Sequence, residues 1–269
     1  MFSASRKVLA IVLLACGTAA NARELRVCAD PNNRPFSAQD GSGMENKIAD
    51  VIGQELGAKL TYTWFAQRRG FLRNTLNAGK CDLVLGIPAG MEMLRTTRPY
   101  YRSGYVFVRR ESAPKVESLD DPALKGMKIG VQLIGNDATN TPPVHALGHR
   151  GISENVRGFM VYGDYESPDP VSPIVEAVAS GDVDIAIMWG PPAGYYAAKQ
   201  KVKLAIDPVP PSTREGDPPM RFEIAMGVRK GDAELAAEVD RALTARRADI
   251  DAILAAYHVP RFDQPGARK

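Results

Sequence analysis

The sequence has 269 residues, of which 45% are hydrophobic and 24% are charged. This length and composition exclude a disordered chain and a small scaffold built on metals or several disulfides, and they allow two lobes with an apolar core in each. The 34 lysines and arginines nearly balance the 31 acids, for a formal net charge of +3, so the charge does not indicate a polyanionic partner.

Residues 1–22 differ from the rest of the chain and are typical of an export signal. Arg6 and Lys7 precede an apolar run over residues 8–15, and the small residues 20–22 resemble a signal-peptidase site. The apolar run is too short to cross a bilayer. We predict cleavage before Arg23 and export. Two alternatives stay open, a first buried helix and a lipoprotein anchored at Cys16, which ends the sequence Leu-Leu-Ala-Cys.

Cleavage before Arg23 would leave two cysteines, Cys28 and Cys81, in an oxidising compartment where paired thiols persist as disulfides. Each lies in an apolar, strand-like stretch, so the two could be neighbours on adjacent strands. A Cys28–Cys81 disulfide is our working hypothesis, and a pair of buried free thiols is the alternative. A redox site is not indicated, because the sequence has no Cys-x-x-Cys spacing.

Strand and helix patterns alternate along the first part of the chain. Residues 25–29, 59–64 and 82–87 are apolar strand-like runs, with helical stretches between them. We expect the first helix to begin with a capping box of Ser42 and Glu45 and to end at Gly57. Because strands that alternate with helices form parallel βαβ units, we predict an α/β fold.

A weak internal repeat indicates two similar halves. Helix, Gly79, two residues, Asp82 and an apolar strand recur as helix, Gly181, two residues, Asp184 and the strand 185–188. The extended segments 104–108 and 202–206 are placed where the chain would cross between lobes, and a strand at 222–228 and two helices follow. We therefore predict a discontinuous first lobe of residues 23–106 and 207–269, a second lobe of residues 107–206, and rotation near Tyr105 and Leu204.

Motifs of common enzyme classes are absent from the sequence. It has no phosphate-binding Gly-x4-Gly-Lys-Ser/Thr loop, no Gly-x-Gly-x-x-Gly fingerprint and no Gly-x-Ser-x-Gly nucleophile elbow. His145 and His149 have the spacing of two zinc ligands on a helix, but Gly148 and the prolines before them favour an exposed pair instead. We predict no catalytic residues, no metal and no cofactor.

Polar and aromatic residues follow the predicted strands, where ligands bind on parallel sheets. Arginine beside aromatic rings suits anions or planar polar ligands. The alternatives are a solvated helix start for the arginines and simple packing for the tryptophans. The candidate cleft residues are Asn32 and Phe36 after the first strand, Trp64, Arg68 and Arg69 after the second, Pro88 after the third, and Gln132, Asn136 and Trp189 in the second half.

Three stretches, residues 26–36, 67–82 and 97–103, resemble the type II periplasmic binding proteins, and more narrowly their MoxJ/XoxJ-like group. The resemblance covers residues 24–260. It implies a two-lobed Venus-flytrap fold in the periplasm, each lobe a mainly parallel sheet flanked by helices, with two crossing hinge strands. It also implies a non-catalytic accessory role in PQQ-dependent methanol or alcohol oxidation, with the quinoprotein dehydrogenase or its cytochrome as partner. Arg95 is the best match to the family's first-lobe arginine.

Two departures from that family bear on the ligand. Gly135, Asn136 and Asp137 replace the Gly-Thr-Thr-like turn that grips a carboxylate in amino-acid-binding relatives, and Trp189 falls where they have an aspartate for the amine. Both argue against an amino acid as ligand. The alternative functions are a receptor for a small polar or anionic solute, linked to an ABC transporter, and an unrecognised enzyme.

Overall fold

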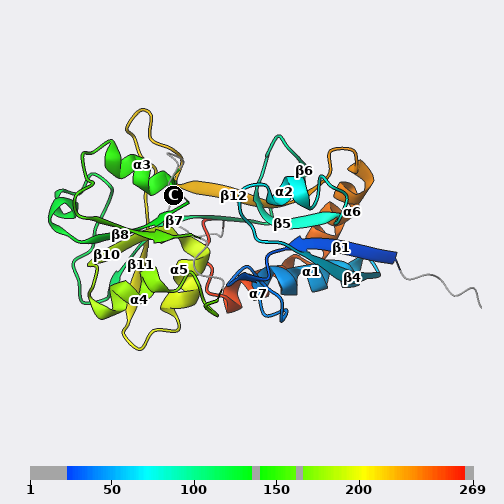
Figure 1. The fold of residues 1–269 in the computed structure, drawn as a ribbon, viewed down its shortest axis with the longest axis horizontal. Coiled ribbons are helices and arrows are strands. Elements are labelled where there is room, and N and C mark those ends of the chain that lie inside the picture. Colours follow the sequence, from blue (N-terminus) through cyan, green and yellow to red (C-terminus); the bar gives the residue numbers. More distant parts are fainter. Residues whose placement is uncertain (1–22, 135–139, 162–165, 264–269) are drawn as a thin grey trace, which may run out of the picture.

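The computed structural model describes residues 23–134, 140–161 and 166–263, which form two lobes joined by long strands (Figure 1). The export signal and Asn136 lie outside these residues. The first lobe contains β1 (Arg23–Ala29), β2 (Asn32–Asn33), β3 (Ser37–Ala38), α1 (Met44–Glu55), β4 (Ala58–Trp64), α2 (Phe71–Asn74), β5 (Leu83–Pro88), β6 (Arg95–Thr96), α6 (Ala233–Ala245) and α7 (Arg247–Ala256). The second lobe contains the 3-10 helix η1 (Pro122–Gly126), β8 (Ile129–Leu133), α3 (Pro142–Gly148), β9 (Val156–Met160), α4 (Pro173–Ser180), β10 (Ile185–Trp189), α5 (Gly190–Ala197) and β11 (Leu204–Pro208).

Two long strands, β7 (Tyr101–Arg110) and β12 (Arg221–Val228), join the two halves of the sheet. The strand order is β4-β1-β5-β12-β7-β10-β8-β9, with β6 paired to β12 and β11 paired to β7. The outer trios β4-β1-β5 and β10-β8-β9 are parallel, whereas β12 and β7 run antiparallel to each other and to their other neighbours. The predicted α/β fold with mainly parallel lobes and crossing strands is confirmed.

The return crossing lies later in the chain than the sequence pattern predicted. Residues 204–208 form β11, which pairs along its full length with residues 106–110 of β7 and so belongs to the second half of the sheet. The chain returns between β11 and β12, where Arg221 is the register partner of Gly104. The alternating pattern at 202–206 predicts a strand, and most of that segment does form β11. The pattern does not indicate which strand lies beside it, so it cannot distinguish a crossing strand from one that stays in the second lobe.

The internal repeat has the same structural role in both lobes. The Asp82 backbone N–H donates to the Arg26 carbonyl at 2.7 Å, and its carboxylate accepts from the Arg26 N–H at 3.3 Å. The Asp184 N–H donates to the Lys128 carbonyl at 2.8 Å, and its carboxylate accepts from the Lys128 N–H at 2.8 Å. In each lobe the aspartate therefore fixes the start of one parallel strand to the strand beside it.

Helix α1 packs its apolar face on the first-lobe sheet together with α6 and α7. Its capping differs from the prediction. Gly43, not Ser42, precedes the first turn, and the Asn46 side-chain oxygen accepts from the Gly43 N–H at 3.1 Å. The predicted capping box of Ser42 and Glu45 is therefore wrong. Because Asn46 takes this role, the Glu45 side chain is free to point elsewhere.

None of the helices among the described residues is long and apolar enough to cross a membrane. The second-lobe helices pack on the two faces of their sheet (Figure 1). Helix α3 packs in the hydrophobic cluster on one face, and α4 and α5 pack in the cluster on the other face.

The disulfide hypothesis is confirmed. Cys28 on β1 and Cys81, just before β5, are bonded and buried, with their Cα atoms 5.5 Å apart and a sequence separation of 53. Phe71, Leu76 and Leu94 surround the bond in a small core on the far side of the sheet from α1. The bond therefore holds the α2 region against the first strand.

Replacing both Cys28 and Cys81 by Ala should lower the free energy of unfolding by about 3 kcal/mol, because the unfolded chain regains the entropy of a long loop. Urea unfolding followed by circular dichroism measures the change. A reductant should destabilise the original protein to a similar extent and leave the double variant unchanged.

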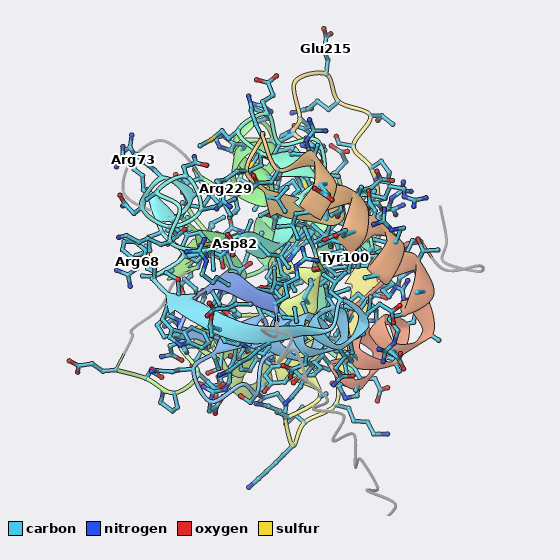
Figure 2. All side chains as sticks on the ribbon, turned by 90° about the vertical axis from the view of Figure 1, so that its right-hand side faces the viewer. Arg68, Arg73, Asp82, Tyr100, Glu215 and Arg229 are labelled. Atoms are coloured by element: carbon cyan, nitrogen blue, oxygen red, sulfur yellow. A yellow bond between two sulfur atoms is a disulfide. The ribbon has the colours of Figure 1, made fainter. Side chains whose placement is uncertain are left out.

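An ion-pair network around Asp82 ties three segments together at the outer end of the first lobe. The carboxylate accepts from Arg26 Nη2 at 2.7 Å and from Arg229 Nη2 at 2.9 Å, and only 16% of the Asp82 side chain is exposed. Figure 2, which views the molecule from this end, shows Asp82 beside Arg229. Burial of the carboxyl opposes ionisation, but the hydrogen bonds from Arg26 and Arg229 outweigh it and lower the pKa of Asp82 to about 2.

Replacing Asp82 by Asn should therefore cost about 2 kcal/mol of stability at neutral pH. A carboxyl whose pKa is lowered in the folded state stabilises the fold at pH values above its unfolded pKa. That stabilisation is lost as the pH falls through the folded-state pKa of about 2. The stability difference between the original protein and the variant should shrink across this acid range. Asp182→Asn, which removes an exposed acid, is the control and should give no such difference.

Candidate functional site

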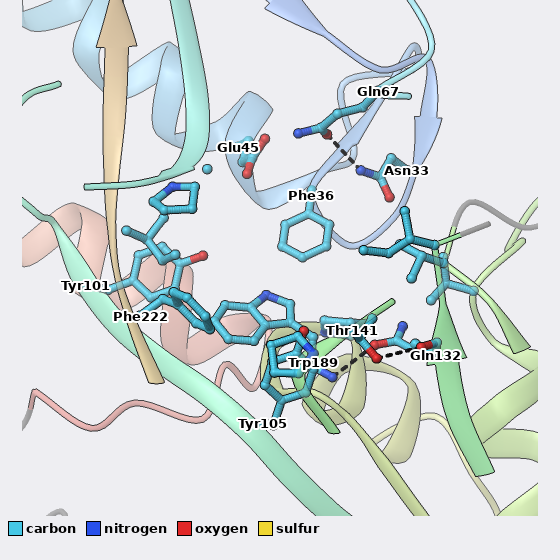
Figure 3. Close-up of a pocket in the computed structure, with 18 residues that line it drawn as sticks. Asn33, Phe36, Glu45, Gln67, Tyr101, Tyr105, Gln132, Thr141, Trp189 and Phe222 are labelled. Atoms are coloured by element: carbon cyan, nitrogen blue, oxygen red, sulfur yellow. Dashed lines mark hydrogen bonds between the residues drawn. The ribbon is translucent and has the colours of Figure 1, made fainter. Parts of the chain in front are cut away.

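A cleft of about 340 Å³ lies between the lobes, at the ends of the parallel strands and against the crossing strands (Figure 3). The carboxyl ends of β5 and β10 reach it from the two lobes, as expected for parallel sheets. Its lining is predominantly aromatic and aliphatic. The lining residues are Asn33, Phe36, Glu45, Gln67, Gly86, Pro88, Tyr101, Tyr105, Gln132, Ile134, Thr141, Pro142, Val161, Val171, Trp189, Pro192, Phe222 and Ile224.

Trp189 forms the centre of the aromatic wall. Its ring meets those of Tyr105 and Phe222 edge to face, at centroid distances of 5.5 Å and 5.9 Å. The Trp189 backbone N–H donates to the Gln132 side-chain oxygen at 3.0 Å, and the Thr141 hydroxyl donates to the Gln132 carbonyl at 2.6 Å. Because these contacts come from both crossing strands and from β8, the indole is held in one position.

The acidic side of the cleft is Glu45, in the first turn of α1. Its carboxyl lies against Gly86, where a Cβ atom would come within 1.9 Å of the Glu45 oxygen. Gly86 also has φ of +69°, a backbone conformation that other residues rarely adopt. The glycine in β5 therefore makes room for the carboxyl beside the sheet.

The Glu45 carboxyl lies in a poorly solvated position. Burial raises its pKa to about 8, and the nearby Asp30 carboxylate adds to the shift by repulsion. Among the described residues, no hydrogen bond or ion pair reaches the Glu45 carboxyl. The group is therefore a half-buried acid that faces the cleft without a partner among the described residues.

Asp30 organises the turn that carries the first-lobe rim. Its carboxylate accepts from the backbone N–H groups of Asn32 at 2.8 Å and Gln67 at 2.6 Å. The Asn33 side-chain nitrogen donates to the Gln67 side-chain oxygen at 3.0 Å (Figure 3). These bonds use polar groups of Asn33 and Gln67 within the rim, and Phe36 and Glu45 line the space beside them.

Direct bonds between the lobes close one flank of the cleft. The Asn32 side-chain nitrogen donates to the Ser167 carbonyl at 2.7 Å, and the Arg34 guanidinium donates to the Pro168 carbonyl at 2.9 Å. The Tyr196 hydroxyl donates to the Arg34 carbonyl at 3.0 Å. Asn32 and Arg34 are therefore interlobe contacts in this conformation.

The structure brings together four of the ten cleft residues expected from the sequence, namely Phe36, Pro88, Gln132 and Trp189. Asn32 lies on the closed flank, and Asn136 lies outside the described residues. Trp64 stacks on Tyr62, with ring centroids 4.7 Å apart. Arg68 and Arg69 are exposed and do not line the cleft, and Arg95, in β6, donates to the Lys230 carbonyl at 3.1 Å instead.

Sequence reasoning missed Glu45, Tyr101, Tyr105 and Phe222 as lining residues. Glu45 was assigned to a helix cap, and the aromatic residues lie on strands whose pattern predicts burial rather than a binding surface. A signal was available for Tyr105, since it lies in the predicted crossing segment 104–108, which passes between the lobes.

The predicted histidine pair does not form a metal site in the described part of the chain, where no group of three potential ligands was found. His145 is exposed on α3, and His149 lies 2.8 Å from Asp217 through Nδ1. Asp217 also pairs with Arg150 at 2.6 Å, so these residues fasten the loop before β12 to α3.

Comparison with known proteins identifies the family. The family model of bacterial extracellular solute-binding proteins, family 3, matches residues 25–260. The chain belongs to this family. Protein MoxJ of Methylorubrum extorquens is 34% identical over 253 residues, which cover 89% of this chain and 82% of that protein.

Two solved structures have the fold of this family-3 protein over most of its length. Periplasmic binding protein XoxJ from Methylobacterium extorquens AM1 aligns with a TM-score of 0.72 and 35% identity, covering 89% of this chain and 100% of that one. MxaJ from Methlophaga aminisulfidivorans MPT aligns with a TM-score of 0.76 and 27% identity, covering 88% and 99%. The resemblance inferred from three sequence stretches is confirmed.

Replacing Glu45 by Gln should leave stability unchanged near pH 4 and increase it progressively up to about pH 8. A carboxyl whose pKa is raised in the folded state makes the fold progressively less stable as the pH rises from its unfolded pKa toward its folded pKa. The neutral Gln amide does not titrate, so the variant has no such loss of stability. We expect a gain of more than about 1 kcal/mol at pH 8, measured by urea unfolding. Asp50→Asn, an exposed change on the same helix, should show no such pH dependence.

Proposed function

We propose that this chain is a non-catalytic periplasmic binding protein that assists PQQ-dependent methanol or alcohol oxidation, with the dehydrogenase or its cytochrome as its partner. The observation that carries the proposal is the likeness to protein MoxJ and to XoxJ along nearly the whole chain. The sequence motifs of that group imply the link to quinoprotein dehydrogenases. The cleft between the lobes is the part of the molecule that we assign to recognition.

The chemistry of the cleft supports an accessory role over the receptor for a small anionic solute. An anion-binding site needs cationic or N–H donor groups aimed at the ligand. Within residues 23–134, 140–161 and 166–263, no side chain that lines the cleft carries a guanidinium or ammonium group. The lining offers aromatic rings, neutral side-chain amides that bond within the cleft walls, and one carboxyl, which would repel an anion at pH values where the carboxyl is ionised.

The topology suggests how the protein would respond to binding. We assign the first lobe to residues 23–106 together with the chain from β12 onward, and the second lobe to residues 107–208, which include all of β11. The crossing strands β7 and β12 would act as the hinge. Tyr105 lies at the point where β7 changes its partner from β12 to β10. Rotation there would move Trp189 relative to Phe36 and so open or close the cleft.

A pull-down from periplasm tests the role. Tagged chain from Arg23 onward should recover a PQQ dehydrogenase or its cytochrome from methanol-grown cells and much less from succinate-grown cells. A stoichiometric small molecule in the eluate, without either protein partner, would instead identify a transporter-linked receptor.

Two matched variants locate the contact. Pro88→Arg places a bulky cation at the cleft, and Pro99→Arg makes the same change at an exposed position beside α6. If the cleft engages the partner, Pro88→Arg should reduce recovery at least about fivefold while Pro99→Arg does not. Equal recovery by both variants would place the partner contact outside the cleft.

A further inference from the structure

We infer that the interlobe cleft binds a small organic monocation, a protonated amine carried on an apolar or aromatic body, with the Glu45 carboxylate as its counter-ion. The inference rests on the proposed function in one respect, that the cleft is the recognition site. It adds the chemical class of the ligand and the residue that selects it.

The charge of the lining is the first argument. Glu45 carries the single carboxyl among the described lining residues, and that part of the lining has no cation. The carboxyl receives no hydrogen bond or ion pair from the described residues. Removing such a group from water is costly unless a partner is supplied, and an ammonium group from a ligand would supply both the charge and the hydrogen bonds.

The arrangement of the aromatic rings is the second argument. Figure 3 shows the Glu45 carboxyl on the cavity side, with the Phe36 ring beside it and the Trp189 indole across the space. The faces of aromatic rings attract cations, most strongly for tryptophan. An organic cation would therefore place its nitrogen at Glu45 and its apolar body among Phe36, Trp189 and Phe222.

Size favours a small molecule as the occupant. A volume of about 340 Å³ falls at the lower end of the range for small-molecule sites. The bonds from Asn32 to Ser167 and from Arg34 to Pro168 close one flank, so a small ligand would lie within the cleft while a partner protein contacts its rim. An anion of the same size would meet no compensating cation among the described residues and would be excluded.

Binding of a cation should be linked to proton release. The titratable groups that face Glu45 are the Asp30 carboxyl and the phenols of Tyr62, Tyr100 and Tyr101. None of these is a cation, and the pKa of each of the three phenols is raised, so the phenols stay neutral. Because burial raises the pKa of Glu45 to about 8, the ligand must displace a proton below that pH.

The test uses three probes of nearly equal size that differ in charge: benzylammonium, benzyl alcohol and benzoate. Each is titrated into the purified chain from Arg23 onward, and binding is followed by calorimetry and by tryptophan fluorescence. We expect benzylammonium to bind at least about tenfold more tightly than benzyl alcohol, and benzoate to give no measurable binding. The affinity for benzylammonium should rise as the pH approaches about 8, with a proton released on binding.

Two variants assign the effect to Glu45. Glu45→Gln should reduce the affinity for benzylammonium at least about tenfold, without changing that for benzyl alcohol, and it should remove the proton release. Asp50→Asn removes an exposed acid from the same helix and should change neither. Melting curves of both variants confirm that they are folded before the comparison is made.

Preference for benzoate or benzyl alcohol, no binding of benzylammonium, or unchanged binding by Glu45→Gln would each overturn the inference. These measurements need no dehydrogenase and no cell extract. A failed pull-down with cation binding intact would therefore reject the accessory role alone. A successful pull-down with no cation binding would reject the ligand class alone.

Discussion

Strand β7 hydrogen-bonds with β12 through residues 101–104 and with β10 and β11 through the rest of its length, so one strand belongs to both halves of the sheet. This sharing places the two sets of parallel strands on either side of a common pair, with their carboxyl ends facing each other. The cleft, its aromatic wall and the hinge all follow from that arrangement. Tyr101, Tyr105 and Phe222 line the cleft because they lie on the strands that pass between the lobes.

The polar groups of the cleft are used in two different ways. Asp30, Asn33 and Gln67 bond to one another or to the backbone around them, and Gln132 supports the backbone of Trp189. These groups hold the walls in place. Glu45 differs because helix α1 is capped by Asn46 and Gly86 leaves space for its carboxyl. A half-buried acid without a described protein partner is costly for stability, and such sites are where a ligand can contribute most.

The sequence determined most of the architecture. Alternating apolar runs and helix signals identified the first-lobe trio β4, β1 and β5 and the second-lobe strand β10, because side-chain periodicity reflects burial on a sheet or helix face. The repeated spacing from Gly79 to Asp82 and from Gly181 to Asp184 marked a unit whose aspartates make the same backbone bonds in each lobe. The Cys28–Cys81 pairing was also accessible, since both cysteines lie at the edges of apolar strands in a chain expected to be exported.

Only the tertiary structure decided which side chains meet in the cleft. Arg68, Arg69 and Arg95 had the residue type and approximate position of ligand-binding groups, yet they lie outside the lining because the direction of a side chain after a strand depends on the following loop. The sequence pattern predicts Glu45 as a helix cap because capping boxes are recognised from local spacing. The side-chain oxygen of Asn46 takes that role, accepting from the backbone N–H groups of Ala38 and Gly43, and this is visible only in the three-dimensional contacts. Local spacing fixes strands and helices, whereas the cleft brings together residues more than 100 positions apart, such as Phe36 and Trp189, which line it from opposite lobes.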